Sequence, residues 1–113
     1  LTEVVATPDF GEQCDAWGVE LDPPSFNQPV ASDVPALLLV GDFDPATPVD
    51  YAERVASGLS RSTLVVFPGL GHGTVFAPTP CPGDILQAFV EAPDAAVDTS
   101  CVAELGPPQW TVP

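Results

Sequence analysis

Hydrophobic and polar residues follow no sustained period over residues 1–33, and prolines interrupt this segment repeatedly. We therefore expect an extended lead-in there, with a short turn or the start of a helix at residues 14–17. The pattern becomes regular at residue 34. Residues 34–40 form a continuous aliphatic run that ends at Gly41, which predicts a strand buried on both faces.

A helix and a second strand follow this run. Residues 49–59 place their apolar side chains at helical spacing, with Val55 and Leu59 on one face. Thr47 can cap this helix, and Pro48 suits its first position. Residues 62–67 are rich in β-branched side chains and stop at a Pro-Gly pair, which predicts a strand.

Strand, helix and strand in this order form a βαβ unit, which should cross over with a right hand. A Gly-His-Gly loop and a proline-rich loop come next, residues 83–91 predict a final helix, and the tail is irregular. The expected fold class is α/β, with residues 1–33 as a lead-in and residues 34–113 as a βαβ unit plus a helix.

Two parallel strands make an incomplete sheet, because parallel strands need neighbours on both edges and cover on both faces. Each strand would leave an unpaired hydrophobic edge in an isolated monomer. We expect the missing neighbours to come from more of the same chain, or from a second copy through self-association of these edges.

Charge excludes several classes of partner. The 113 residues hold 16 acidic and 2 basic side chains, for a net charge of −14. With Arg54 and Arg61 as the only cations, no surface can neutralise phosphates, so we expect no nucleic-acid partner. The absence of lysine excludes a Walker-type loop and Schiff-base chemistry. The longest apolar run, residues 36–40, is far shorter than the roughly 20 residues that cross a bilayer.

Two polar residues follow the two predicted strands at their carboxyl ends. Asp44 comes shortly after the first strand and His72 shortly after the second. Parallel strands align these ends at the sheet edge where open α/β folds bind ligands, so we expect the two side chains to meet. A carboxylate bonded to an imidazole fixes its tautomer, and the other ring nitrogen can then take a proton from a nucleophile.

Other interpretations of these loops stay open. Asp44 could only cap a turn, His72 could be an ordinary loop histidine, and Asp42 is a rival carboxylate that more readily faces solvent or caps a turn. Gly71 and Gly73 would leave room around the imidazole. The acidic residues after the first strand also resemble an EF-hand spacing, but no glycine stands where that loop turns sharply, so calcium is poorly supported.

The three cysteines are Cys14, Cys81 and Cys101, and none of them has the spacing of a structural zinc site. Cys81 and Cys101 bracket the final helix and a proline-containing loop, so we expect them to pair in an oxidising compartment. Cys14 would then have no partner within the chain. The alternative is three reduced, buried thiols.

Three segments together resemble a known family. Residues 34–48 (VPALLLVGDFDPATP) are similar to the penultimate-strand segment of α/β-hydrolases, and the likeness is closer to the tripeptidyl- and prolyl-aminopeptidase branch with its TAP-like C-terminal domain. Residues 68–74 (PGLGHGT) resemble the catalytic-histidine loop of that family. Residues 14–17 (CDAW) resemble its Cys-x-x-Trp stretch, and the later cysteines its C-terminal pair. The likeness covers about residues 14–105.

This resemblance implies that Asp44 is the acid and His72 the base of a Ser-Asp-His triad. No serine here stands in a nucleophile elbow, and the family order puts the serine, the oxyanion hole and the substrate-selecting cap upstream. The chain would then be the C-terminal part of a secreted bacterial serine exopeptidase that needs no cofactor, inactive without its upstream part. The alternatives are an esterase of the same fold, acting on small esters, and a non-catalytic assembly module.

Overall fold

The computed structural model describes residues 10–18, 20 and 22–108. Its centre is a sheet of two parallel strands, β1 (Ala36–Gly41) and β2 (Ser62–Phe67). Their register pairs Ala36 with Ser62 and Gly41 with Phe67, so the strands start and end together. The helix α2 (Val49–Gly58) connects them, which confirms the predicted βαβ unit.

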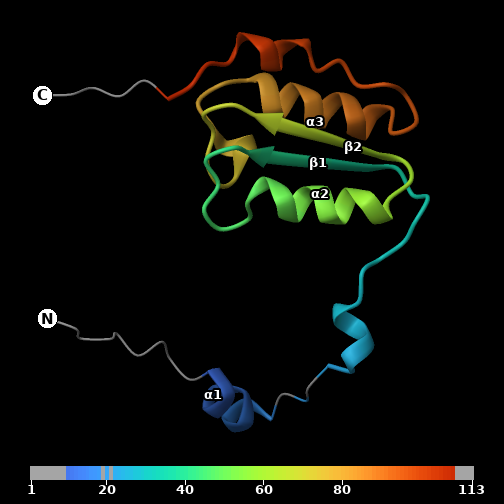
Figure 1. Cartoon of the computed structure of the whole chain (residues 1–113), viewed down its shortest axis with the longest axis vertical. Coiled ribbons are helices and arrows are strands. Elements are labelled where there is room, and N and C mark those ends of the chain that lie inside the picture. Colours follow the sequence, from blue (N-terminus) through green and yellow to red (C-terminus); the bar gives the residue numbers. More distant parts are fainter. Residues whose placement is uncertain (1–9, 19, 21, 109–113) are drawn as a thin grey trace, which may run out of the picture.

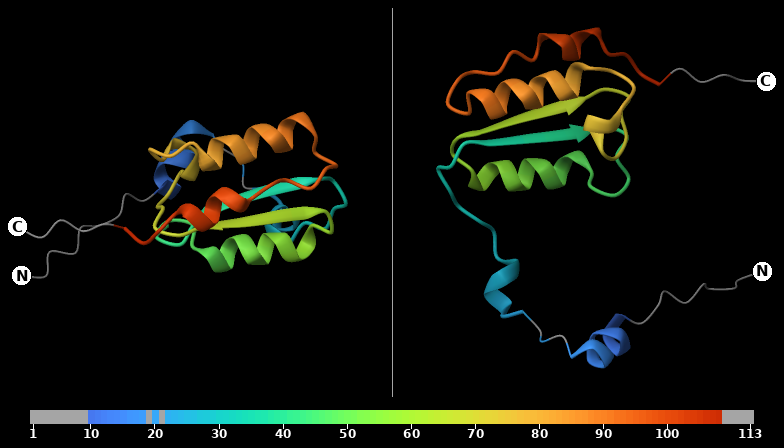
Figure 2. Two further views of the ribbon diagram at one scale, coloured as in Figure 1. Left: turned by 90° about the horizontal axis from the view of Figure 1, so that it is seen from above. Right: turned by 180° about the vertical axis from the view of Figure 1, so that it is seen from behind.

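Helices cover both faces of this sheet. Figures 1 and 2 show α2 on one side and α3 (Cys81–Glu91) on the other. A short 3-10 helix, η2 (Thr74–Phe76), lies between β2 and α3, and the tail carries a second one, η3 (Ser100–Glu104). The result is a three-layer α/β arrangement with an open sheet.

The element boundaries differ from the predicted ones where proline is involved. The first strand starts at Ala36 and not at Val34, because Pro35 has no N–H for the ladder, and the first bond runs from Ala36 N–H to the Arg61 carbonyl. The last helix starts at Cys81 and not at residue 83, because proline is tolerated in the first turn of a helix, where Pro82 stands.

The buried core lies between the sheet and α3. Val65 and Phe67 from β2 pack with Cys81 and Ile85 from α3, and all four side chains are almost fully buried. The predicted disulfide between Cys81 and Cys101 is present and ties η3 to the start of α3. Partly buried apolar residues of the tail complete this cluster, namely Val97, Val102 and Leu105.

The lead-in contains more helix than expected and does not join the core. Its helix α1 spans Phe10–Trp17, and a 3-10 turn, η1, spans Pro24–Asn27. Trp17 and Phe26 are 84% and 70% exposed, and Figure 1 shows α1 and the turn after it apart from the sheet. The end of the lead-in does reach the sheet, where Ser32 bonds to Gly58 and Ser60. The radius of gyration is accordingly 18.5 Å, against about 13 Å for a compact domain of this length. Within the described ranges, no helix has the length and hydrophobicity of a membrane span.

Candidate active site

Two loops meet at the carboxyl edge of the sheet, one after each strand. The loop after β1 is bonded to the end of β2 and to the loop beyond it: Asp42 N–H donates to the Phe67 carbonyl (3.1 Å), and Phe43 N–H to the Leu70 carbonyl (3.0 Å). Gly41 makes this approach possible, because a Cβ there would lie 2.1 Å from the Leu70 oxygen. The sequence pattern indicates only that a strand ends at Gly41, because the packing role of this residue depends on a loop distant in the chain.

Asp42, the rival carboxylate, has a structural function in this arrangement. Its side chain is exposed, as expected, and its Oδ1 accepts the Gly69 N–H at 2.6 Å. Gly69 itself has a φ of +74°, which favours glycine at this turn. The carboxylate of Asp42 therefore holds the start of the loop that carries His72.

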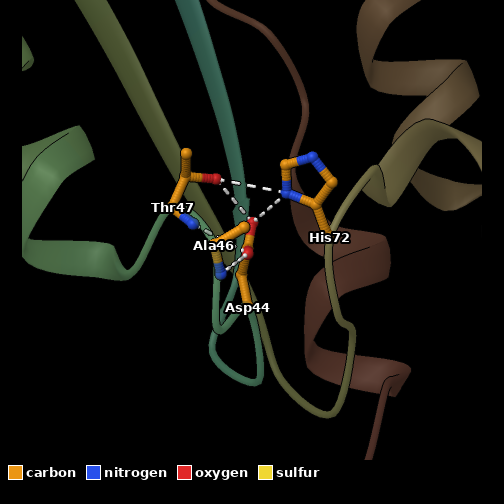
Figure 3. Close-up of polar contacts among 4 residues, drawn as sticks. All are labelled: Asp44, Ala46, Thr47 and His72. Atoms are coloured by element: carbon orange, nitrogen blue, oxygen red, sulfur yellow. Dashed lines mark hydrogen bonds and ion pairs between the residues drawn. The ribbon is translucent and has the colours of Figure 1, made fainter. Parts of the chain in front are cut away.

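Asp44 and His72 meet at this edge, as the strand alignment predicts. Asp44 Oδ2 lies 2.9 Å from His72 Nδ1, and Figure 3 shows the carboxylate facing one ring nitrogen while the other nitrogen points away. The Asp44 side chain is only 5% exposed, whereas the His72 side chain is 63% exposed. The pair thus has a buried acid and an imidazole whose second nitrogen can reach an external group.

The carboxylate of Asp44 is saturated with hydrogen-bond donors. Oδ1 accepts the backbone N–H groups of Ala46 (2.8 Å) and Thr47 (2.9 Å). Oδ2 accepts the Thr47 hydroxyl at 2.7 Å and faces His72 Nδ1. Four donors occupy the roughly four lone-pair sites of a carboxylate. These bonds hold the pKa of Asp44 well below its ordinary value, first through Thr47 N–H and then through the Thr47 hydroxyl, while desolvation opposes them.

The structure corrects the prediction that Thr47 caps the next helix. The N-cap of α2 is Pro48, no side chain caps it, and the first helical residue is Val49. The Thr47 hydroxyl turns back to Asp44 instead, because a buried carboxylate is a charged acceptor and forms the stronger hydrogen bond. Thr47 Oγ1 also lies 3.4 Å from His72 Nδ1, so sequence reasoning missed a third member of the site.

A hollow of about 300 Å³ lies beside the imidazole. Its lining runs from Gly69 to Thr74 and continues with Phe76, Ala77 and Pro78. Gly73 has a φ of +72°, so its backbone requires glycine, in line with the expected freedom around His72. Gly71 has no such requirement, because a Cβ there would meet only the Phe43 oxygen at an ordinary 3.7 Å.

Comparison with known proteins decides the family. A family model described as TAP-like protein, within the α/β-hydrolases, matches residues 5–101. The chain belongs to the TAP-like family. No curated protein and no solved structure matches it. The match confirms the resemblance and the α/β-hydrolase fold class, of which the observed open sheet is a part.

The serines of this TAP-like chain lie away from the imidazole. Ser62 stands at the first position of β2, and Ser60 bonds to the carbonyl of Ser32, near the amino edge of the sheet. A strand of this length spans roughly 17–20 Å, which separates these residues from the carboxyl edge. Ser25 is in the lead-in and Ser100 in the tail. Across residues 22–108, no serine forms a hydrogen bond with His72, whose side-chain partners are Asp44 and Thr47.

Two further features concern metal ions and the remaining thiol. In the described part of the chain, no group of three or more His, Cys, Asp or Glu side chains could hold a metal ion. Cys14 is a free, exposed thiol on α1. It lies in the lead-in, apart from the disulfide of the tail.

Proposed function

We propose that this TAP-like chain supplies the acid and the base of a Ser-Asp-His triad in a serine hydrolase. The observation that carries the proposal is the contact between Asp44 Oδ2 and His72 Nδ1, made by a buried, donor-saturated carboxylate at the carboxyl edge of a parallel sheet. Catalytic groups of α/β folds gather at this edge. The proposed roles are proton acceptor for His72 and orienting anion for Asp44.

The chemistry then follows the order of acyl transfer. A serine hydroxyl attacks the substrate carbonyl while His72 Nε2 takes its proton, and the imidazolium is stabilised by Asp44. His72 returns the proton to the leaving group, which departs as the acyl-enzyme forms. Water repeats the sequence and releases the acid. No metal or cofactor takes part in these steps.

We place the nucleophilic serine and the oxyanion hole outside residues 1–113, in the upstream part of the same hydrolase domain. The support is the distance of the chain's own serines from the carboxyl edge and their local bonds, such as that of Ser62 to the Leu59 carbonyl. The upstream part would also pair with the free edge of β1 and cover the α2 side. Self-association through the same edges is the competing explanation for that surface.

The substrate class we propose is a peptide with a free N-terminus, from which the enzyme releases residues. The support is the resemblance of residues 34–48 and 68–74 to the aminopeptidase branch. A small ester is the alternative substrate. The disulfide supports an oxidising compartment, so we propose a protein exported from a bacterial cell.

The decisive experiment uses the natural protein that contains this chain. It combines labelling by a fluorophosphonate probe with turnover of aminoacyl and tripeptidyl anilides and of nitrophenyl esters. We expect His72→Ala and Asp44→Asn to lower kcat by about 10⁴-fold. Asp50→Asn is the matched control, because Asp50 is an exposed carboxylate on α2, and it should keep activity within about twofold.

Two results would overturn this proposal. A His72→Ala protein that keeps more than a few per cent of turnover would remove the imidazole from the mechanism. A natural protein that resists the probe and self-associates with increasing concentration in the ultracentrifuge would favour the assembly module. Turnover of nitrophenyl esters without measurable turnover of any anilide would keep the triad and change the substrate class to esters.

A further inference from the structure

We propose that Thr47 is a positioning residue, whose hydroxyl holds Asp44 Oδ2 so that His72 keeps its proton on Nδ1 and leaves Nε2 free as the base. The contacts are 2.7 Å from Thr47 Oγ1 to Asp44 Oδ2 and 3.4 Å from Thr47 Oγ1 to His72 Nδ1. The inference deepens the proposed function and rests on it for its catalytic consequence. Its structural content concerns only this chain.

The protons that each group carries determine which atom donates in each hydrogen bond. A threonine hydroxyl has one proton, and the carboxylate of Asp44 only accepts, so the hydroxyl must donate to Oδ2. Its oxygen then presents lone pairs toward His72 Nδ1. Nδ1 therefore faces two acceptors, Oδ2 and Oγ1, and a second lone pair there would be repelled. The proton belongs on Nδ1, which leaves the lone pair on Nε2.

The two carboxylate oxygens are held by different parts of the chain. Oδ1 is fixed by the backbone N–H groups of Ala46 and Thr47, which belong to the loop itself. Within residues 22–108, the partners of Oδ2 are two side chains, the Thr47 hydroxyl and the imidazole. His72 is largely exposed, so water competes for Oδ2 whenever the ring moves. In the described part of the chain, the Thr47 hydroxyl is the fixed donor that keeps Oδ2 aimed at the ring.

Threonine suits this task better than serine. Its β-branch restricts χ1, so less rotamer freedom is lost when the hydroxyl is held in one direction. The Thr47 N–H bond to Oδ1 anchors the same residue at its backbone, so one residue contacts both oxygens of the carboxylate. The lowered pKa of Asp44, to which both Thr47 donors contribute, agrees with this double contact.

The sequence offers a direct readout, because His72 is the only histidine in the chain. Long-range ¹H–¹⁵N NMR of the 113-residue chain, at a pH where the ring is neutral, distinguishes the Nδ1–H from the Nε2–H tautomer. The variants are Thr47→Val, which keeps the shape without the hydroxyl, and Thr47→Ser, which keeps the hydroxyl. Thr63→Val makes the same chemical change on β2, near the other end of the sheet.

We expect the wild type, Thr47→Ser and Thr63→Val to show predominantly Nδ1–H, and Thr47→Val to show a mixture with Nε2–H. Thr47→Ala serves as a second hydroxyl-free variant if Thr47→Val does not fold. An unchanged tautomer in the folded hydroxyl-free variant would overturn the inference. So would an equal change in Thr63→Val, because the effect would then not be local to the site.

In the natural enzyme, Thr47→Val should lower kcat by about 10- to 100-fold with little change in KM, the size of loss seen when a histidine that binds a metal loses its orienting partner. Thr47→Ser should recover most of this loss. The two proposals fail separately. If turnover depends on His72 but the tautomer of His72 is the same with and without the Thr47 hydroxyl, the positioning inference is wrong. If the tautomer depends on Thr47 but turnover does not depend on His72, the triad is wrong.

Discussion

The two faces of the sheet are covered very differently, although both are apolar in sequence. On the α3 side, Phe67 and Ile85 are 0% and 1% exposed, and a disulfide ties the tail across the cluster. On the α2 side, no residue of the helix is buried, and Tyr51 and Val55 are 52% and 53% exposed. Hollows of about 500 and 270 Å³ flank that helix.

This difference shows which face of the sheet this chain can bury with its own residues. The α3 side gathers residues that are distant in sequence, from β2 through α3 to η3, and excludes water from them. The α2 side has a helix joined to both strands by short loops. The described residues 28–30 line a hollow beside Val55 and Leu59 but leave the Val55 side chain half exposed. We propose that this exposed apolar area is the surface that the upstream part of the domain covers.

The strongest test of this comparison removes the covalent link on the α3 side. Replacing Cys81 and Cys101 together by serine should lower the free energy of unfolding by about 3 kcal/mol, because it reopens a loop closed over a separation of 20 residues. Urea denaturation of oxidised wild type and variant measures the change. Cys14→Ser is the control, since this exposed thiol touches neither face, and it should be nearly neutral.

A smaller effect comes from two neighbouring valines that point to opposite faces of β2. Val65 is 5% exposed on the α3 side and Val66 is 37% exposed on the α2 side. Val65→Ala should cost about 2–3 kcal/mol, because it leaves a cavity in the core, and Val66→Ala under about 1 kcal/mol. Equal losses in the 113-residue chain would show that both faces are equally packed. A larger loss for Val66→Ala in the natural protein would show that its upstream part covers this face.

Local signals made most of the fold predictable. The β-branched run and the Pro-Gly stop gave the limits of β2, and the aliphatic run ending in Gly41 gave β1 apart from its start, where Pro35 intervenes. The meeting of Asp44 and His72 followed from the alignment of parallel strands, which a βαβ unit guarantees. These inferences needed only the order of elements along the chain.

The predictions that failed or were missing depend on contacts between distant segments. Thr47 has the residue type and position of a helix cap, and only the approach of Asp44 and His72 shows that its hydroxyl bonds elsewhere. Gly41 ends its strand as predicted, but its close packing against the Leu70 carbonyl has no signal in the local sequence. Asp42 is exposed as predicted, but its partner, the Gly69 N–H, lies 27 residues away and could not be named from the local sequence. The two loops are far apart in the sequence, and they meet only at the carboxyl edge of the folded sheet.

The smallest expected effect concerns stability in acid. Here the carboxyl edge of the sheet, with Asp44, is compared with the tail on the α3 side, with Asp98. Asp44 has a pKa lowered from 3.8, first by Thr47 N–H, and Asp98 has one lowered by Ser100 N–H. A lowered folded-state pKa means that the unfolded chain takes up protons first, so the stabilisation is present above about pH 4 and is lost as the pH falls below it.

Urea denaturation between about pH 7 and pH 2.5 should therefore show a steeper loss of stability in the wild type than in either Asp→Asn variant. Asp44→Asn should flatten the profile more, because four donors meet that carboxylate. The test distinguishes the contribution of Asp44 at the sheet edge from that of Asp98 in the tail. Profiles of wild type and Asp44→Asn that run parallel below pH 4 would mean that the Asp44 network does not persist in solution. A greater flattening in Asp98→Asn would place the acid sensitivity on the disulfide-bonded side, and the two loops of the site would then contribute little to the fold that carries them.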